Sequence, residues 1–190
     1  MQEYAFIAEA APPTIAVVRA IRPDQFAAPT PCRDFDVRGL IEHMLRWGPA
    51  LAAASRNPVE AVPPEGDPQD RLARQLGQIA AAWATPAAWQ GMTSMGGPQE
   101  MPARVVGAMA VAEIVVHGWD LARATGQDVA WDPRLLDFLH DEVAKTAALG
   151  REVEAYGPEV SVPRTASPLA RMLGLTGRDP AWTDSVVPGR

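Results

Sequence analysis

The chain has 190 residues, 47% of them hydrophobic, and a formal net charge of −6. This length suits one domain with its own core, so we expect a single domain over residues 1–190. The negative charge argues against a nucleic-acid-binding surface. The N-terminus lacks a basic segment, and no apolar run is expected to span a bilayer. The single cysteine, Cys32, fits a reducing compartment. These features predict a cytoplasmic protein that binds neither nucleic acid nor membranes.

Proline divides the first part of the chain into helical segments. Residues 3–21 are alanine-rich, but Pro12 and Pro13 interrupt them, so a helix is expected to begin or kink there. After a proline-rich loop, Asp36 is placed to cap a helix over residues 37–55, where the apolar side chains follow helical spacing.

Asp67 and Pro68 then mark the start of a further helix that carries a narrow apolar stripe. The Gly- and Pro-rich residues 85–101 cannot sustain a helix and predict a long crossover, with at most a small hairpin. Two more helices follow, over residues 103–124 and 133–150, before a Pro-rich tail with one short helical turn. Four strong helices with one long connection predict an all-α bundle in which residues 37–55 and 103–124 pack side by side.

The segment Val105–Ala124 is apolar nearly all round, which is typical of a buried helix. At ~100° per residue, Glu113 and His117 lie one above the other, and Asp120 lies one turn further along the same face. A buried carboxylate without a partner costs several kcal/mol or takes up a proton. A bound cation and a neutral imidazole would satisfy it, so the pattern favours a metal-binding helix.

A third ligand would have to come from elsewhere in the chain, which has only three histidines. By helical geometry His43 lies on the flank of its helix's apolar stripe, a position that suits a side chain aimed between two neighbouring helices. His140 lies among acidic residues on the fifth helix and is expected to be solvated. We therefore leave His140 out of the candidate site.

Three motifs follow one another along the chain. They are Pro29-Thr30-Pro31-Cys32-x-x-Phe35-Asp36-Val37-Arg38-x-Leu40-Ile41-x-His43, then Glu113-x-x-Val116-His117-Gly118-Trp119-Asp120-Leu121-Ala122, and finally Tyr156-Gly157-Pro158 with Leu173-Gly174-Leu175-Thr176-Gly177-Arg178-Asp179-Pro180-Ala181-Trp182. With these motifs the chain resembles, over about residues 14–182, the DinB-like metal-binding superfamily, in the actinobacterial branch related to mycothiol-dependent maleylpyruvate isomerase. The resemblance implies a DinB-like four-helix bundle with one long crossover connection, a fifth helix and a Pro-rich C-terminal tail.

The resemblance also implies that His43, Glu113 and His117 are the ligands of one divalent metal, zinc or alternatively nickel. Such a set leaves at least one coordination position open, as catalytic zinc sites do. The chain differs from the family in the Pro12-Pro13 pair, which is expected to break the usual first helix. We also expect no separate C-terminal domain like that of the isomerase.

Three other residues have both a functional and a structural interpretation. Asp120 could support a ligand, act as a base, or pair with an arginine at a helix end. Trp47 lies one turn from His43 and could form the floor of a substrate cavity, although tryptophans at such positions more often serve packing. Cys32 could be a ligand or nucleophile, but cysteine mostly behaves as a small buried hydrophobe.

These observations favour an enzyme that uses a divalent metal and a low-molecular-weight thiol such as mycothiol to act on a small molecule, as an S-transferase or isomerase. A bound metal would lower the pKa of the thiol, so that a thiolate exists at neutral pH. One alternative is a metal-dependent hydrolase or rearrangement enzyme of specialised metabolism, and another is a non-enzymatic binder of metal or small molecules. The sequence identifies neither the substrate nor the oligomeric state.

Overall fold

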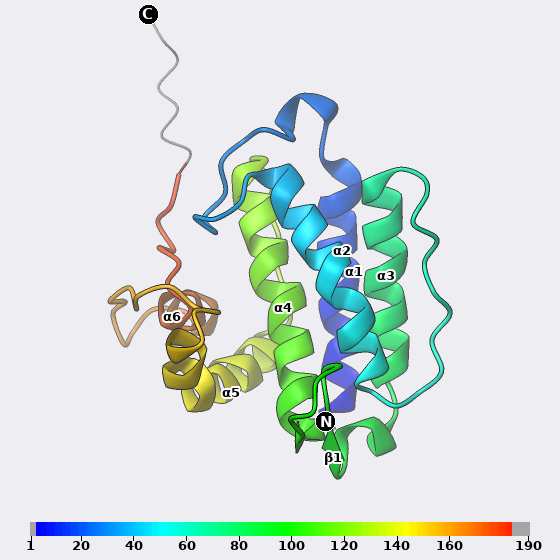
Figure 1. Cartoon of the computed structure of the whole chain (residues 1–190). Helices are drawn as coiled ribbons and strands as arrows, with labels where there is room; N and C mark the ends of the chain where they lie inside the picture. Colours follow the sequence, from blue (N-terminus) through cyan, green and yellow to red (C-terminus); the bar gives the residue numbers. More distant parts are fainter. Residues whose placement is uncertain (1–2, 184–190) are drawn as a thin grey trace, which may run out of the picture.

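A computed structural model describes residues 3–183, and over this range the chain forms six α-helices (Figure 1). The helices are α1 (Tyr4–Ala20), α2 (Val37–Ala53), α3 (Pro68–Trp83), α4 (Ala103–Ala124), α5 (Pro133–Glu152) and α6 (Pro168–Leu175). Two short 3₁₀ turns, η1 (Pro23–Gln25) and η2 (Pro86–Trp89), and two short strands, β1 (Met92–Thr93) and β2 (Met101–Pro102), complete the elements. The prediction of an all-α protein is confirmed.

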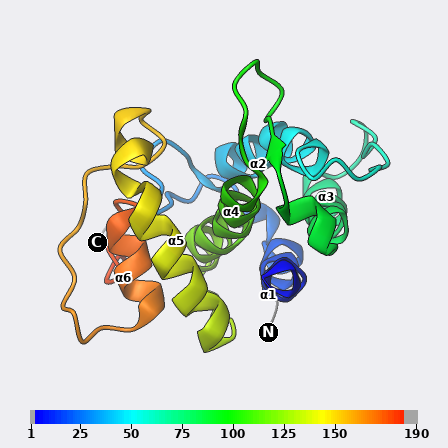
Figure 2. The same ribbon diagram turned by 90° about the horizontal axis from the view of Figure 1, so that it is seen from below.

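The first four helices form the bundle. Helices α1 and α2 each pack against both α3 and α4, and α5 and α6 pack against each other beyond α4. Figure 2 shows α4 in the middle, with α1, α2 and α3 on one side and the α5–α6 pair on the other. The DinB-like bundle with an added fifth helix is thereby confirmed, and α2 lies beside α4 as predicted.

Local signals in the sequence explain where the helices begin. Asp36 accepts a hydrogen bond from the backbone N–H of Gly39 at 2.7 Å and so caps α2. Asp67 caps α3 in the same way and is followed by Pro68 in the first turn. The crossover contains the small antiparallel hairpin that its glycines and prolines suggested, because β1 pairs with β2.

The expectation that Pro12 and Pro13 break the first helix is wrong, because both lie inside α1, which runs from Tyr4 to Ala20. Each proline removes one helical hydrogen bond, which costs ~3 kcal/mol in an isolated helix. Tertiary contacts offset this loss, since α1 packs on both α3 and α4. At the closest point Thr14 donates a hydrogen bond to the carbonyl of Ile114 at 3.0 Å, and any side chain at position 118 in place of glycine would collide with Thr14.

Helix α4 is the central element of the fold. It is also long and apolar enough to cross a membrane by length and composition, so the expectation of no such run is wrong. In the structure, however, 83% of its most apolar window is buried inside the protein. The helix is thus the buried core element that its pattern predicted, and it gives no indication of a membrane protein. Because α4 is buried, the positions of Glu113 and His117, which face α2, are set by packing.

Candidate metal centre

Three side chains from two helices converge between α2 and α4. The Nε2 atom of His43 lies 3.3 Å from Oε1 of Glu113, and Nε2 of His117 lies 3.4 Å from the same oxygen. One potential ligand atom from each residue lies within 4.8 Å of the other two. The structure therefore brings together the three residues that the sequence singled out, although they lie up to 74 positions apart in the numbering (117 − 43).

Helix geometry and packing explain this convergence. Glu113 and His117 are four residues apart on α4 and share one face. His43 projects from the flank of α2, where its ring packs against Phe35 with ring centroids 4.9 Å apart and meets the ring of His117 edge-on at 5.2 Å. Phe35 directly precedes Asp36, the cap of α2. The residues at the start of α2 therefore also contact the His43 ring and limit its movement. The sequence analysis did not assign Phe35 this role.

The carboxylate of Glu113 is incompletely satisfied. Its Oε1 atom is buried and has no hydrogen-bond donor of acceptable geometry among the described residues. Burial opposes ionisation of Glu113, but His117 and His43 in their protonated forms, together with Arg178, hold the pKa of this carboxyl below its ordinary value. An ionised oxygen that faces two imidazole nitrogens is the donor set that zinc or nickel prefers, so these residues fit a divalent cation.

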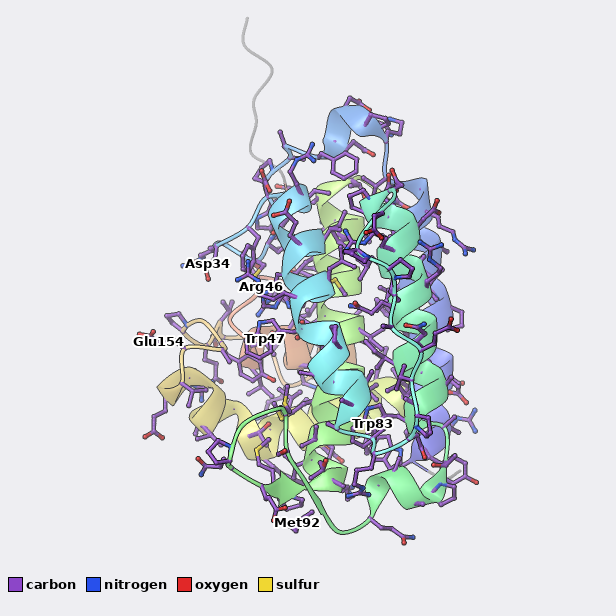
Figure 3. All side chains as sticks on the ribbon, turned by 45° about the vertical axis from the view of Figure 1, so that its right-hand side comes forward. Asp34, Arg46, Trp47, Trp83, Met92 and Glu154 are labelled. Atoms are coloured by element: carbon purple, nitrogen blue, oxygen red, sulfur yellow. The ribbon has the colours of Figure 1, made fainter. Side chains whose placement is uncertain are left out.

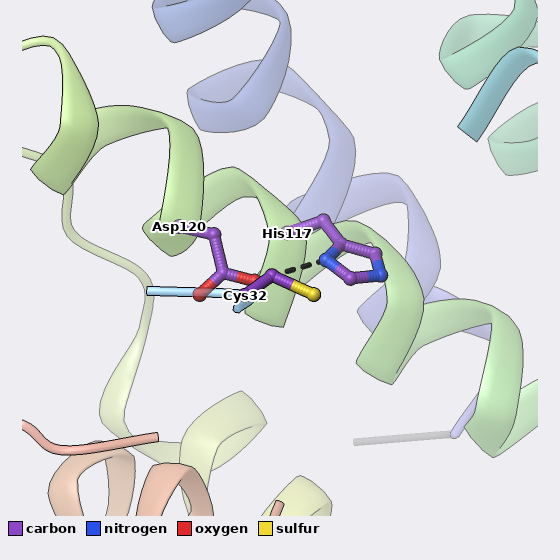
Figure 4. A group of neighbouring side chains, drawn as sticks. All are labelled: Cys32, His117 and Asp120. Carbon is purple, nitrogen blue, oxygen red and sulfur yellow. Dashed lines mark hydrogen bonds and ion pairs between the residues drawn. The ribbon is translucent and has the colours of Figure 1, made fainter. Parts of the chain in front are cut away.

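Asp120 supports His117 from behind. Its Oδ2 lies 2.9 Å from Nδ1 of His117 and accepts a further hydrogen bond from Nη2 of Arg178 at 3.1 Å. Figure 4 shows the first of these contacts. With Asp120 ionised, Nδ1 carries the proton and the lone pair of Nε2 is left free on the side of Glu113. The geometry places Asp120 against a candidate ligand and pairs it with an arginine, which are the contacts that two of its three interpretations require.

Cys32 lies close to the same imidazole. Its sulfur, a ring nitrogen of His117 and a carboxylate oxygen of Asp120 form a second possible cation group (Figure 4). That group shares the imidazole of His117, whose Nδ1 already lies 2.9 Å from Oδ2 of Asp120. Burial raises the pKa of the Cys32 thiol to about 11, although Arg178 opposes the shift. A protonated thiol is a poor ligand and nucleophile, which supports the inert interpretation of Cys32.

The remaining candidates lie outside this cluster. Trp47 is one turn beyond His43 on α2 and is 45% exposed, so it flanks the site instead of filling the core. Figure 3 shows its side chain on the outer flank of α2. His140 does not join the triad, as expected, but its side chain is only 20% exposed and therefore less solvated than its acidic neighbours suggested.

The family described as mycothiol maleylpyruvate isomerase N-terminal domain matches residues 8–122. The chain belongs to this family. The match covers more than half of the chain and includes all three convergent side chains, and it confirms the resemblance seen in the motifs.

Individual relatives add little about function. The chain is 28% identical over 172 residues to an uncharacterized protein of Mycobacterium tuberculosis strain H37Rv, and equally to an uncharacterized protein of strain CDC 1551. Each alignment covers 86% of this chain and 90% of the relative. No solved structure gives a significant match.

Proposed function

We propose that the protein is an enzyme that binds one divalent ion, zinc or alternatively nickel, through His43, Glu113 and His117 and uses a small thiol of the mycothiol type as cosubstrate. The family supports a metal-binding, mycothiol-related protein, and the finer assignment is an S-transferase or isomerase acting on a small molecule. When bound, the ion supplies an open coordination position and lowers the pKa of a thiol held there.

The observation that carries this proposal is the buried Oε1 atom of Glu113. A structural carboxylate at this depth is expected to accept hydrogen bonds from arginine, lysine or backbone N–H groups. Oε1 of Glu113 instead lies 3.3 and 3.4 Å from two imidazole nitrogens and accepts no hydrogen bond from the described residues. Two nitrogens and one carboxylate oxygen make a three-ligand set of the catalytic kind, not a closed four-ligand structural site.

Each neighbouring residue then has a defined task. His43 and His117 bind through Nε2, and Asp120 holds the His117 ring in the tautomer that leaves Nε2 unprotonated. Trp47, exposed one turn from His43, provides an apolar wall for the ligand that enters the open side. We assign no proton transfer to Asp120, because it is fully buried and both of its contacts run to Oδ2.

The test uses cobalt(II) in place of the native ion, because thiolate coordination to cobalt gives a charge-transfer absorption. The loaded protein is titrated with mycothiol, with the His43→Ala variant as control. We expect saturable absorption for the parent and none for the variant. A parent that binds cobalt but never shows the absorption would contradict a thiol-dependent function and favour the hydrolase or the non-enzymatic binder. Turnover that requires the thiol would indicate the transferase or isomerase, turnover without the thiol would indicate the hydrolase, and no turnover would indicate the non-enzymatic binder.

A further inference from the structure

Arg178 connects the candidate metal centre to the C-terminal end of the fold. Its side chain is only 6% exposed, and its two terminal nitrogens donate to Oδ2 of Asp120 at 3.1 Å and to the carbonyl of Thr176 at 2.9 Å. Asp120 has no exposed surface, and the same Oδ2 atom also lies 2.9 Å from Nδ1 of His117. A continuous buried chain therefore runs from the segment after α6 to a candidate ligand on α4.

The backbone around Arg178 is tightly determined. The N–H of Arg178 donates to the carbonyl of Leu173 at 2.9 Å, which closes the C-terminal end of α6. Gly177 has a φ of 83°, and an added Cβ there would lie 2.7 Å from the Cα atom of Gly157. Only glycine fits this position without strain. The turn therefore aims the guanidinium inward at Asp120, and a lysine in its place would lack the rigid planar set of donors that reaches both Asp120 and Thr176.

The charge balance explains why an arginine is needed. A carboxylate as deeply buried as Asp120 loses several kcal/mol of hydration and requires compensating charge and hydrogen bonds. A neutral His117 ring gives it one hydrogen bond but no charge. Arg178 gives it a full positive charge and one hydrogen bond, to the same Oδ2 atom that faces His117.

We propose that Arg178 is a positioning residue for the metal centre: through Asp120 it fixes the His117 ring so that Nε2 faces Glu113. This inference rests on the proposed function. The match to the family ends at residue 122, so Arg178 lies 56 positions beyond it (178 − 122). The C-terminal segment is then a working part of the site and not only a cover for the bundle.

Four variants test this role: Arg178→Gln, Asp120→Asn, the double variant, and Arg123→Gln as a matched control. Arg123 donates to the carbonyl of Trp182 at 2.7 Å, so it anchors the same C-terminal segment without touching Asp120. Zinc affinity is measured by chelator competition at constant pH, and folding by circular dichroism. Partners of this kind typically change metal affinity by about 10–100-fold. We expect that loss for Arg178→Gln and for Asp120→Asn, no further loss in the double variant, and less than a twofold change for Arg123→Gln.

The outcomes separate this inference from the proposal beneath it. If the parent binds no stoichiometric zinc, the metal centre itself is wrong and the role of Arg178 falls with it. If the parent binds zinc and Arg178→Gln binds it within twofold, the positioning role alone is wrong. Equal losses in Arg178→Gln and Arg123→Gln would also overturn it, because they would show a general effect of the tail. Should Arg178→Gln not fold, Arg178→Lys takes its place, with the same expected loss and the same criteria.

Discussion

Two glutamates, one on α4 and one on α5, show how the partners of a carboxylate decide what it does. Glu142, on α5, is 7% exposed and accepts hydrogen bonds from Arg104 at 2.7 Å and from Lys145 at 2.6 Å. Glu113, on α4 itself, faces the Nε2 atoms of two histidines at 3.3 and 3.4 Å, and one of its oxygens accepts no hydrogen bond from the described residues. The first is a completed ion pair, and the second has the character of an incomplete coordination shell.

The difference lies in the charge of the partners. Arginine and lysine bring their own positive charge, so Glu142 needs nothing else. Neutral imidazoles bring lone pairs and no charge, so they leave the negative charge of Glu113 uncompensated and can join its carboxylate in binding a cation. The same acid type against the same helix is therefore expected to support folding in one place and ligand binding in the other. The following predictions test that contrast.

The largest expected effect is on metal content. His117→Ala removes a ligand from α4 and should abolish stoichiometric metal, while the apolar faces of the helices keep most of the fold. Metal analysis of purified parent and variant, with circular dichroism as the check on folding, measures both. His43→Ala and Glu113→Gln should show the same loss. Full metal content in all three variants would contradict the triad.

The next effect is on stability and separates the two glutamates. Glu142→Gln removes the charge that pairs with Arg104 and Lys145 and should lower the free energy of unfolding by about 1–3 kcal/mol. It should leave metal affinity unchanged. Glu113→Gln should abolish stoichiometric metal but lower the free energy of unfolding by less than Glu142→Gln, because Glu113 faces two imidazoles and has no hydrogen bond from arginine or lysine at Oε1. Urea unfolding of both variants decides the matter, and equal destabilisation would erase the contrast.

The pH dependence of Glu142 follows from the same contacts. Burial opposes its ionisation, but Lys145 and Arg104 hold its pKa below the ordinary value. Its stabilising contribution is therefore present above the unfolded-state pKa of about 4.3 and is lost as the pH falls through the lower folded-state value. The gap in stability between parent and Glu142→Gln should narrow below about pH 4. A stability difference between parent and Glu142→Gln that stays constant down to pH 2 would show that the charge of Glu142 is not its source.

A smaller effect is expected at the open side of the Glu113 site. Trp47→Ala removes a side chain that is 45% exposed, so the free energy of unfolding should change by no more than about 0.5 kcal/mol. The affinity of the cobalt-loaded protein for an aromatic thiol should fall several-fold, with little change for a small hydrophilic thiol. Met92→Ala serves as the control, because it also removes an exposed apolar side chain and should leave the affinity for both thiols unchanged. Equal responses to both thiols would show that Trp47 does not contact the ligand.

The smallest effect concerns Cys32. Since its pKa is raised to about 11, the folded protein should react only slowly with iodoacetamide at pH 8 and rapidly once unfolded. Cys32→Ser should retain metal. Loss of metal in this variant would favour the alternative group of Cys32, His117 and Asp120 and would weaken the assignment to Glu113.

Much of the fold could be predicted because local signals agreed with the packing. Asp36 and Asp67 marked helix starts, and the spacing of Glu113 and His117 placed both on one face of α4. The Pro12-Pro13 pair misled, because the sequence shows the lost hydrogen bonds but not the contacts of α1 with α3 and α4. The supporting role of Phe35 and the contact of Arg178 with Asp120 were also missed. Both depend on tertiary distances that no local periodicity encodes.

The central claim is that a cation bound here is held by two imidazole nitrogens and a carboxylate oxygen. X-ray absorption at the zinc edge, on zinc-loaded protein prepared without thiols, tests it most directly. The account predicts nitrogen and oxygen scatterers at about 2.0–2.2 Å and no sulfur. The signal should be lost in His117→Ala. A sulfur scatterer at about 2.3 Å would place the ion on Cys32 and contradict the account.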